Sequence, residues 1–161
     1  MRSIRKATVV AMLLILVLAQ SALAAGPTVF REHLEFSDSQ FCDDQGKLSY
    51  KIELSGQAVG QDFGDRLRIH ILLRGKVWAS NGTTLRVLHS WTEYYDFVAG
   101  TLTIAGLPFG TWVEGSSLRV HARGRLVVDL ATFEPIFMAG QFPDGPPDPH
   151  AWTCELIAAA G

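Results

Sequence analysis

Apolar and polar residues alternate with a period of two along most of the chain after Thr28. The pattern is clearest over residues 48–55, 66–74 and 118–130, where hydrophobic residues share one parity and mostly polar or charged residues share the other. Successive side chains of a β-strand point to opposite faces, so this period indicates strands with one buried face and one wet face. A sheet that is wet on one side is mostly antiparallel. The sequence therefore predicts an all-β protein.

The dipeptide Asn81-Gly82 marks a turn between two of these strands, so the register of the strands can be predicted. A two-residue loop would set apolar residues opposite polar residues on the same face. A three-residue loop, Asn81-Gly82-Thr83, pairs Ser80 with Thr84 instead and keeps the apolar face continuous. We therefore expect a hairpin with the three-residue loop.

The next turn, Ala99-Gly100, would pair Val98 with Thr101 and extend the hairpin into a meander. Gly124 falls on the apolar side of a long strand, where a strand often bends. The remaining segments are interpreted as a first strand, an ambiguous apolar segment and a last strand: Val29–Phe36, Phe133–Phe142 and Ala151–Ala158. About seven to nine strands predict a single antiparallel meander barrel that is similar to lipocalins in architecture only.

The first 24 residues have the layout of a secretory signal peptide. Three basic residues precede a 13-residue, largely apolar run at Ala7–Ala19, and the small-residue triplet Ala22-Leu23-Ala24 follows. Cleavage after Ala24 would leave residues 25–161 as one secreted β-barrel domain with a net charge of −5 instead of −2. That charge gives no reason to expect a nucleic-acid partner. The alternative is an uncleaved anchor, although the run is shorter than the roughly 18 residues that span a bilayer.

The two cysteines, Cys42 and Cys154, lie near opposite ends of the exported part of the chain. Disulfides persist outside the cell, so we expect these two residues to be bonded. The bond would bring the first and last strands together, as a closed barrel or a tightly paired sandwich requires, and would stabilise the fold by about 4 to 5 kcal/mol. The alternative is a pair of free, buried thiols.

One strand of the predicted hairpin places polar groups on the apolar side. In the predicted register, His89, Trp91, Glu93 and Tyr95 all point inward. A carboxylate on an inward face is costly unless it is paired or wetted. Glu93 is therefore a candidate anchor for a ligand hydroxyl or a general acid or base; the alternative is that it reaches water at an open barrel mouth. His89 and Glu93 are about 13 Å apart along a strand, too far to act as a dyad.

Arginines form two stripes on the predicted wet face, one at Arg66, Arg68 and Arg74 with His70 and the other at Arg119, Arg123 and Arg125 with His121. If the two strands are neighbours, these residues form a positive patch that could bind anionic cell-envelope material. The alternative is a solvated strand face. The five histidines lack metal-ligand spacing, so no metal site is predicted. No GxSxG elbow, P-loop or dinucleotide fingerprint is present, which argues against an enzyme and against a bound cofactor.

With the leader in place, the motifs FCDDQ around Cys42 and WTCELIA around Cys154 give the chain a resemblance to a group of proteins. It resembles the small exported two-cysteine β proteins of high-GC Gram-positive bacteria. The resemblance implies export and a barrel-like fold, and it assigns no catalytic or binding residue.

Three functions are compatible with these observations. The first is a non-enzymatic exported protein that holds a small apolar or amphipathic ligand inside the barrel, with the inward-facing aromatic residues and Glu93 as its site. The second is a cell-surface interaction or structural module that uses the arginine stripes. The third is a barrel-type isomerase or cyclase that uses Glu93 and His89, which would require both groups to lie in one pocket with perturbed pKa values.

Overall fold

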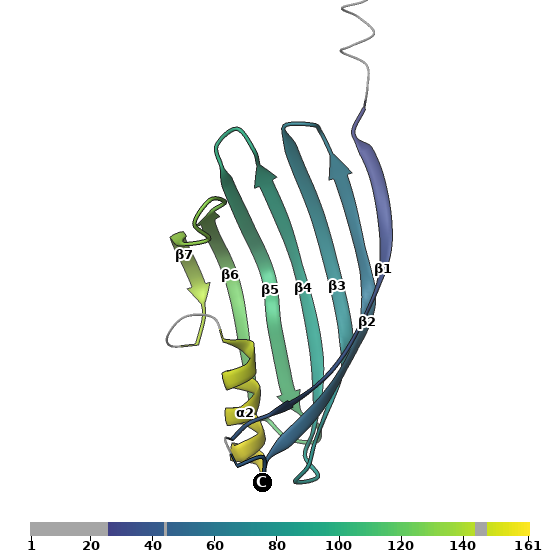
Figure 1. The fold of residues 1–161 in the computed structure, drawn as a ribbon, viewed down its shortest axis with the longest axis vertical. Helices are drawn as coiled ribbons and strands as arrows, with labels where there is room; N and C mark the ends of the chain where they lie inside the picture. Colours follow the sequence, from purple (N-terminus) through teal and green to yellow (C-terminus); the bar gives the residue numbers. More distant parts are fainter. Residues whose placement is uncertain (1–25, 44, 144–147) are drawn as a thin grey trace, which may run out of the picture.

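The computed structural model describes residues 26–43, 45–143 and 148–161. It contains seven strands and a C-terminal helix (Figure 1). Their bounds are β1 (Thr28–Phe41), β2 (Ser49–Asp62), β3 (Arg66–Ala79), β4 (Thr84–Asp96), β5 (Thr101–Val113), β6 (Arg119–Asp129), β7 (Pro135–Gln141) and α2 (Pro149–Ala160). The predicted leader, Met1–Ala24, lies outside the described residues.

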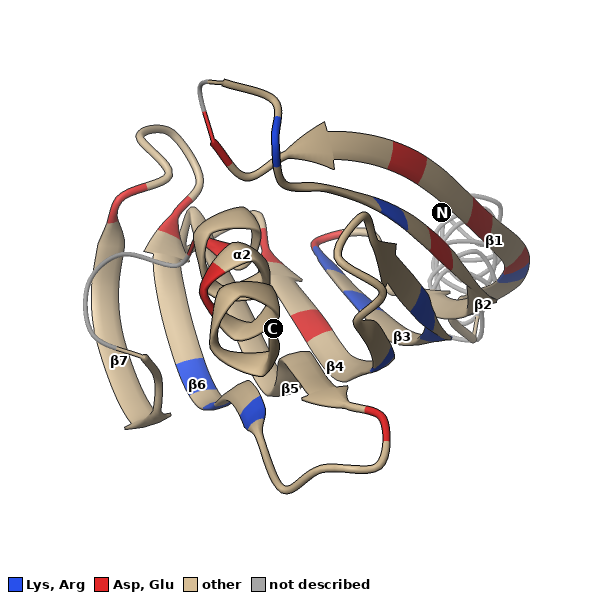
Figure 2. Cartoon of the chain, turned by 90° about the horizontal axis from the view of Figure 1, so that it is seen from below, with Lys and Arg blue, Asp and Glu red and all other residues tan. Residues whose placement is uncertain are grey.

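All seven strands form one antiparallel sheet in the order β1-β2-β3-β4-β5-β6-β7, which confirms the predicted meander. The sheet is strongly curved and open, and α2 lies inside the curve (Figure 2). Among the described strands, β1 pairs only with β2 and β7 pairs only with β6. The predicted closed barrel is therefore not confirmed. We refer to the concave face of this open sheet as the trough.

The β3–β4 hairpin has the predicted faces but a register that differs by two residues. Trp78 pairs with Thr84, so the predicted pairing of Ser80 with Thr84 was wrong. The Ala79 N–H donates to the Thr83 carbonyl oxygen at 2.9 Å, and the loop is Ser80-Asn81-Gly82. Gly82 has φ +88 and occupies the third loop position, where three-residue hairpin loops require a left-handed residue.

The pairing of β4 with β5 also differs by two residues from the prediction. Asp96 pairs with Thr101, and four residues, 97–100, form the turn. The Asp96 side chain accepts hydrogen bonds from the backbone N–H groups of Val98 at 3.1 Å and Ala99 at 2.8 Å. These bonds stabilise the longer turn, as short polar side chains commonly do at turn starts.

The segment predicted as a last strand, Ala151–Ala158, is helical and belongs to α2. Asp148 caps the helix by accepting a hydrogen bond from the Ala151 N–H at 3.0 Å, and Pro149 occupies the first turn. Both residue types favour a helix start at these positions. The buried side chains of α2 are Trp152, Thr153, Leu156 and Ile157, which are spaced as one face of a helix.

The predicted disulfide between Cys42 and Cys154 is present, with a Cα–Cα distance of 5.3 Å. It joins the residue that follows β1 to the middle of α2, whereas the prediction required it to join two strands. The bond therefore attaches a helix to the end of the sheet and does not close the sheet upon itself.

The core occupies the half of the trough that α2 covers. One cluster of buried residues combines Leu156 and Ile157 of α2 with five residues of the sheet: Tyr50, Leu54, Val77, Leu85 and Val87. Both cysteines pack against this cluster. A second cluster consists of Trp152, Phe109 and Ala122, and the Trp152 and Phe109 ring centroids are 5.3 Å apart. The helix thus closes one end of the trough.

Glycines bend the β5–β7 side of the sheet. Gly106, Gly124 and Gly140 pair across these three strands on the concave side. Gly124 has φ +154, and a Cβ atom there would lie 2.2 Å from the Ala139 carbonyl oxygen. The backbones approach so closely only because these residues lack side chains, and such positions curve a sheet. The β5–β6 register shifts between Gly106 and Phe109, directly beside Gly124, so the pairing is irregular where a bend was predicted.

Candidate ligand-binding site

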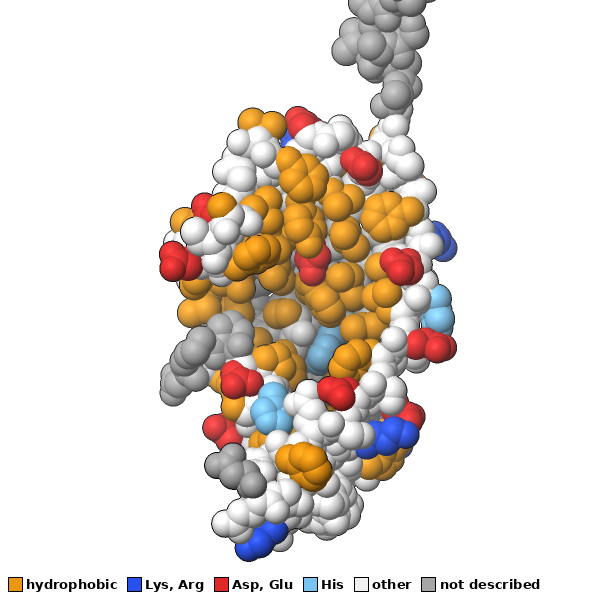
Figure 3. Space-filling model, in the orientation of Figure 1, with side chains coloured by type: hydrophobic (Ala, Val, Ile, Leu, Met, Phe, Trp, Pro, Cys, Tyr) orange, Lys and Arg blue, Asp and Glu red, His pale blue; other side chains and the backbone are white. Residues whose placement is uncertain are grey.

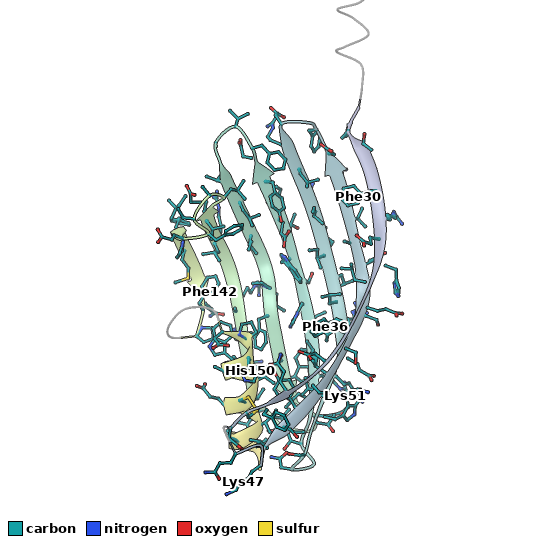
Figure 4. All side chains as sticks on the ribbon, viewed as in Figure 1. Phe30, Phe36, Lys47, Lys51, Phe142 and His150 are labelled. Atoms are coloured by element: carbon teal, nitrogen blue, oxygen red, sulfur yellow. A yellow bond between two sulfur atoms is a disulfide. The ribbon has the colours of Figure 1, made fainter. Side chains whose placement is uncertain are left out.

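The half of the trough beyond α2 exposes hydrophobic side chains to solvent. Figure 3 shows a concave, largely hydrophobic surface with acidic side chains in and beside it. Side chains from both edges of the sheet contribute to it: Phe30 (38% exposed), Phe36 (49%) and Met138 (52%). Phe30 and Phe36 lie along β1 at one margin (Figure 4). We call this region the open half of the trough.

The four inward residues predicted as a ligand site lie on β4, the central strand of the sheet. His89, Trp91, Glu93 and Tyr95 share the parity of the buried residues Leu85 and Val87, so all four face the trough. The structure thus brings them together in one row on the concave face. Residues two apart on a strand are close enough for neighbouring side chains in this row to interact.

Glu93 is held by its two neighbours in this row. Trp91 Nε1 donates a hydrogen bond to Glu93 Oε1 at 2.8 Å, and the Tyr95 hydroxyl donates to Oε2 at 2.8 Å. Across the sheet, Glu93 pairs with Ile69 on one side and Ile104 on the other. Each carboxylate oxygen can accept about two hydrogen bonds. Glu93 is therefore a fixed acceptor with unused capacity, set between two isoleucines.

The donors to Glu93 remain protonated at neutral pH. Burial, together with the hydrogen bond to Glu93 and the charge of that residue, raises the pKa of Tyr95 to about 12. The Trp91 indole N–H is a permanent donor. In the described part of the chain, the ion pairs involve other residues than Glu93. Its hydrogen-bond partners are thus neutral, and no basic side chain of residues 26–43, 45–143 and 148–161 forms an ion pair with its carboxylate.

His89 lies where the open half meets the helix-covered half. Its ring centroid is 5.5 Å from that of Phe109, which packs against Trp152 of α2, and 6.3 Å from that of Trp91. Burial lowers the pKa of His89 to about 4, so the imidazole is neutral at pH 7. Its Nε2 is buried without a hydrogen-bond partner among the described residues. Unsatisfied buried polar atoms are uncommon and are often explained by an unseen partner.

Glu93 and His89 do not form an acid–base pair. Trp91 lies between them on β4, and both carboxylate oxygens of Glu93 accept hydrogen bonds from Trp91 and Tyr95. The row therefore supplies an acceptor at one position and a neutral ring at another. This arrangement suits the binding of a polar group in an apolar setting better than proton transfer between the two residues.

The two arginine stripes lie on the convex face, on strands that are not neighbours. Arg66 and Arg68 belong to β3, Arg119 and Arg123 belong to β6, and β4 and β5 separate these strands. The condition of that prediction, that the two strands are neighbours, is therefore not met, although Arg125 of β6 lines one shallow hollow together with Arg66 and Arg68 of β3. The Arg68 guanidinium lies 5.5 Å from the centre of the Tyr94 ring. Shallow hollows of about 470 Å³ and 710 Å³ lie beside the two stripes.

The sequence analysis did not identify the residues that close one end of the trough. Trp152 and its neighbours on α2 form this end wall, and they were assigned to a strand. The pair Asp148-Pro149 was the available signal, because a cap residue followed by proline is typical of a helix start.

Among residues 26–43, 45–143 and 148–161, no helix has the length and apolar composition needed to cross a membrane. Comparisons of the chain with protein-family models, curated proteins and solved structures find no match.

Proposed function

We propose that this protein is an exported, non-enzymatic binding protein that holds a small apolar or amphipathic ligand in the open half of the trough. The observation that carries the proposal is the exposed hydrophobic concave face with Glu93 fixed within it. Binding sites for small molecules are typically concave, mostly apolar and equipped with a few oriented polar groups. The Cys42–Cys154 disulfide is compatible with export.

The arrangement of the core supports the same proposal. Helix α2 fills one half of the trough and gives it an end wall of Trp152 and Phe109, while the other half has no covering element among the described residues. Large exposed apolar patches are unusual in soluble proteins and often mark binding sites. The open half of the trough would thus serve as the ligand site, as the enclosed interior does in a lipocalin-like barrel.

A neutral, polarity-sensitive dye such as N-phenyl-1-naphthylamine tests this proposal. We expect saturable binding with enhanced fluorescence, and we expect Phe36→Ala to weaken it about tenfold, because truncating the ring removes apolar contact area. Trp78→Ala is the matched control, since Trp78 is similarly exposed (41%) but has the parity of the convex face. The control should bind the dye like the wild type.

Native mass spectrometry of the protein purified from its own host provides a second readout, in which a lipid-like mass should accompany the protein. Dye binding that does not saturate, or that Trp78→Ala weakens as much as Phe36→Ala does, would overturn the proposal.

A further inference from the structure

The two faces of the sheet differ in charge. The strands carry ten of the basic residues, and each has the parity of the convex face: Arg31, Lys51, Arg66, Arg68, Arg74, Lys76, Arg86, Arg119, Arg123 and Arg125. The charged side chains of the described strands that have the concave parity are acidic: Glu32, Asp38, Asp62 and Glu93. In Figure 3, red side chains lie in and beside the hydrophobic surface, and blue side chains lie only at its margin.

Glu93 is the carboxylate best placed to interact with a ligand. Its cross-strand neighbours are Ile69 and Ile104, and its two hydrogen-bond donors are uncharged. Charges interact more strongly where apolar side chains replace water, because the effective dielectric constant is lower there. An ammonium group at this position would be attracted and could donate to the unused lone pairs of Glu93. A carboxylate or phosphate would be repelled and would find no basic partner in the described trough.

The geometry points to a ligand class: we propose that the open half of the trough binds a cationic amphiphile, an apolar chain or ring system that carries a protonated amine, and that it discriminates against fatty acids. The ammonium lies at Glu93, next to the aromatic rings of Trp91 and Tyr95, which also attract cations. The apolar body extends along the exposed hydrophobic surface. This inference rests on the proposed function and adds the charge of the ligand to it.

Displacement of the neutral dye by ligands of equal chain length tests the inference. The probes are dodecylamine, dodecan-1-ol and dodecanoate at pH 7, each below the concentration at which it forms micelles. We expect the amine to displace the dye at a concentration at least about tenfold lower than dodecanoate does, with the neutral alcohol in between. N-acetyldodecylamine, which has lost the charge, should behave like the alcohol.

Glu93→Gln tests the assigned anchor, and a circular dichroism spectrum like that of the wild type shows that the variant is folded. The preference is read as the ratio of two displacement concentrations on the same variant, so a change in its affinity for the dye cancels. The preference for the amine over dodecanoate should fall to about threefold or less in this variant. Glu53→Gln is the matched control, because it removes one carboxylate from the convex face of β2, where Glu53 forms an ion pair with Lys51 at 2.6 Å. That control should keep the wild-type preference.

The outcomes separate the inference from the function on which it rests. If all four probes displace the dye equally, or if dodecanoate is preferred, the inference is overturned and the proposed function stands. If the preference for the amine survives in Glu93→Gln, the anchor assignment is overturned. If neither the dye nor any probe binds, the proposed function itself fails. If Glu93→Gln does not fold, the comparison of dodecylamine with its N-acetyl derivative on the wild type decides the question.

Discussion

Removing the Cys42–Cys154 disulfide should lower the free energy of unfolding substantially. The bond closes a loop with a sequence separation of 112, which in the chain-entropy model corresponds to about 5 kcal/mol at 25 °C. Both cysteines also pack against the cluster that contains Leu156 and Ile157, so the bond holds α2 on the end of the sheet. For the variant Cys42→Ala/Cys154→Ala we expect a loss of about 3 to 5 kcal/mol.

Urea unfolding followed by tryptophan fluorescence measures this loss, because Trp152 and Trp91 both lie in or beside the trough. With a slope of about 2 kcal/mol per molar urea, the midpoint should fall by about 2 M. The wild type unfolded in the presence of a reductant is the control and should match the double variant. A shift below about 0.5 M in both would refute the reasoning, since it would mean that packing of α2, and not the covalent bond, fixes the helix to the sheet.

Three further predictions concern His89, Gly124 and the start of α2. The pKa of His89 is lowered by burial to about 4, whereas a histidine in the unfolded chain titrates near 6.5. The unfolded chain therefore binds more protons between these values, so the free energy of unfolding should be highest above pH 6.5 and fall by about 3 kcal/mol as the pH is lowered to 4. Urea unfolding across this pH range should show the decrease. In His89→Gln this part of the pH dependence should be missing. Gly124→Ala should lower the free energy of unfolding by about 2 kcal/mol through its positive φ and its clash with the Ala139 carbonyl oxygen, while Gly26→Ala, with no atom within 4 Å of the added Cβ, should leave the melting temperature unchanged. Asp148→Ala removes the cap on the Ala151 N–H and should cost about 1 kcal/mol in the same unfolding assay, whereas Asp148→Asn, which keeps an acceptor, should cost much less.

Over residues 48–130 the alternation of residue types was sufficient to predict the strands and their faces, but not their register. A slip of two residues leaves every side chain on its own face, so the hydrophobic pattern cannot distinguish the predicted hairpin from the observed one. The turn decides between them. Gly82 adopts φ +88 at the third loop position, and this requirement places the loop at Ser80-Asn81-Gly82.

The closed barrel was predicted because the last segment was assigned to a strand. In that segment the buried residues Trp152, Thr153, Leu156 and Ile157 occupy both parities, whereas a half-buried strand buries one parity. The spacing is that of a helix face, but a short apolar segment is ambiguous between a strand and a helix. Once the segment is helical, the disulfide links a helix to the end of β1, and no further strand among the described residues joins β1 to β7.

The inward position of the four β4 residues followed from parity alone, whereas the contacts among them did not. Residues two apart on one face lie about 7 Å apart, which lets Trp91 and Tyr95 reach Glu93 between them. Whether they donate to it depends on side-chain rotamers, and these are fixed by packing against neighbours such as Phe97, whose ring centroid is 6.1 Å from that of Tyr95. The two hydrogen bonds to Glu93 could therefore be identified only from the structure.

Charge selection in the trough is a consequence of the same alternation that builds the sheet. Each strand places its arginines and lysines on one parity, and the meander keeps that parity on one face across all the pairings. Moving one basic residue to the other parity would place its charge among hydrophobic side chains, which costs desolvation free energy. On the described strands, the charged residues at that parity are acidic. Glu93 is tolerated because Trp91 and Tyr95 hydrogen-bond to it, and these bonds neutralise none of its charge. The concave face of the described strands thus carries carboxylates but no arginine or lysine, and this is the basis of our inference that it selects a cationic amphiphile.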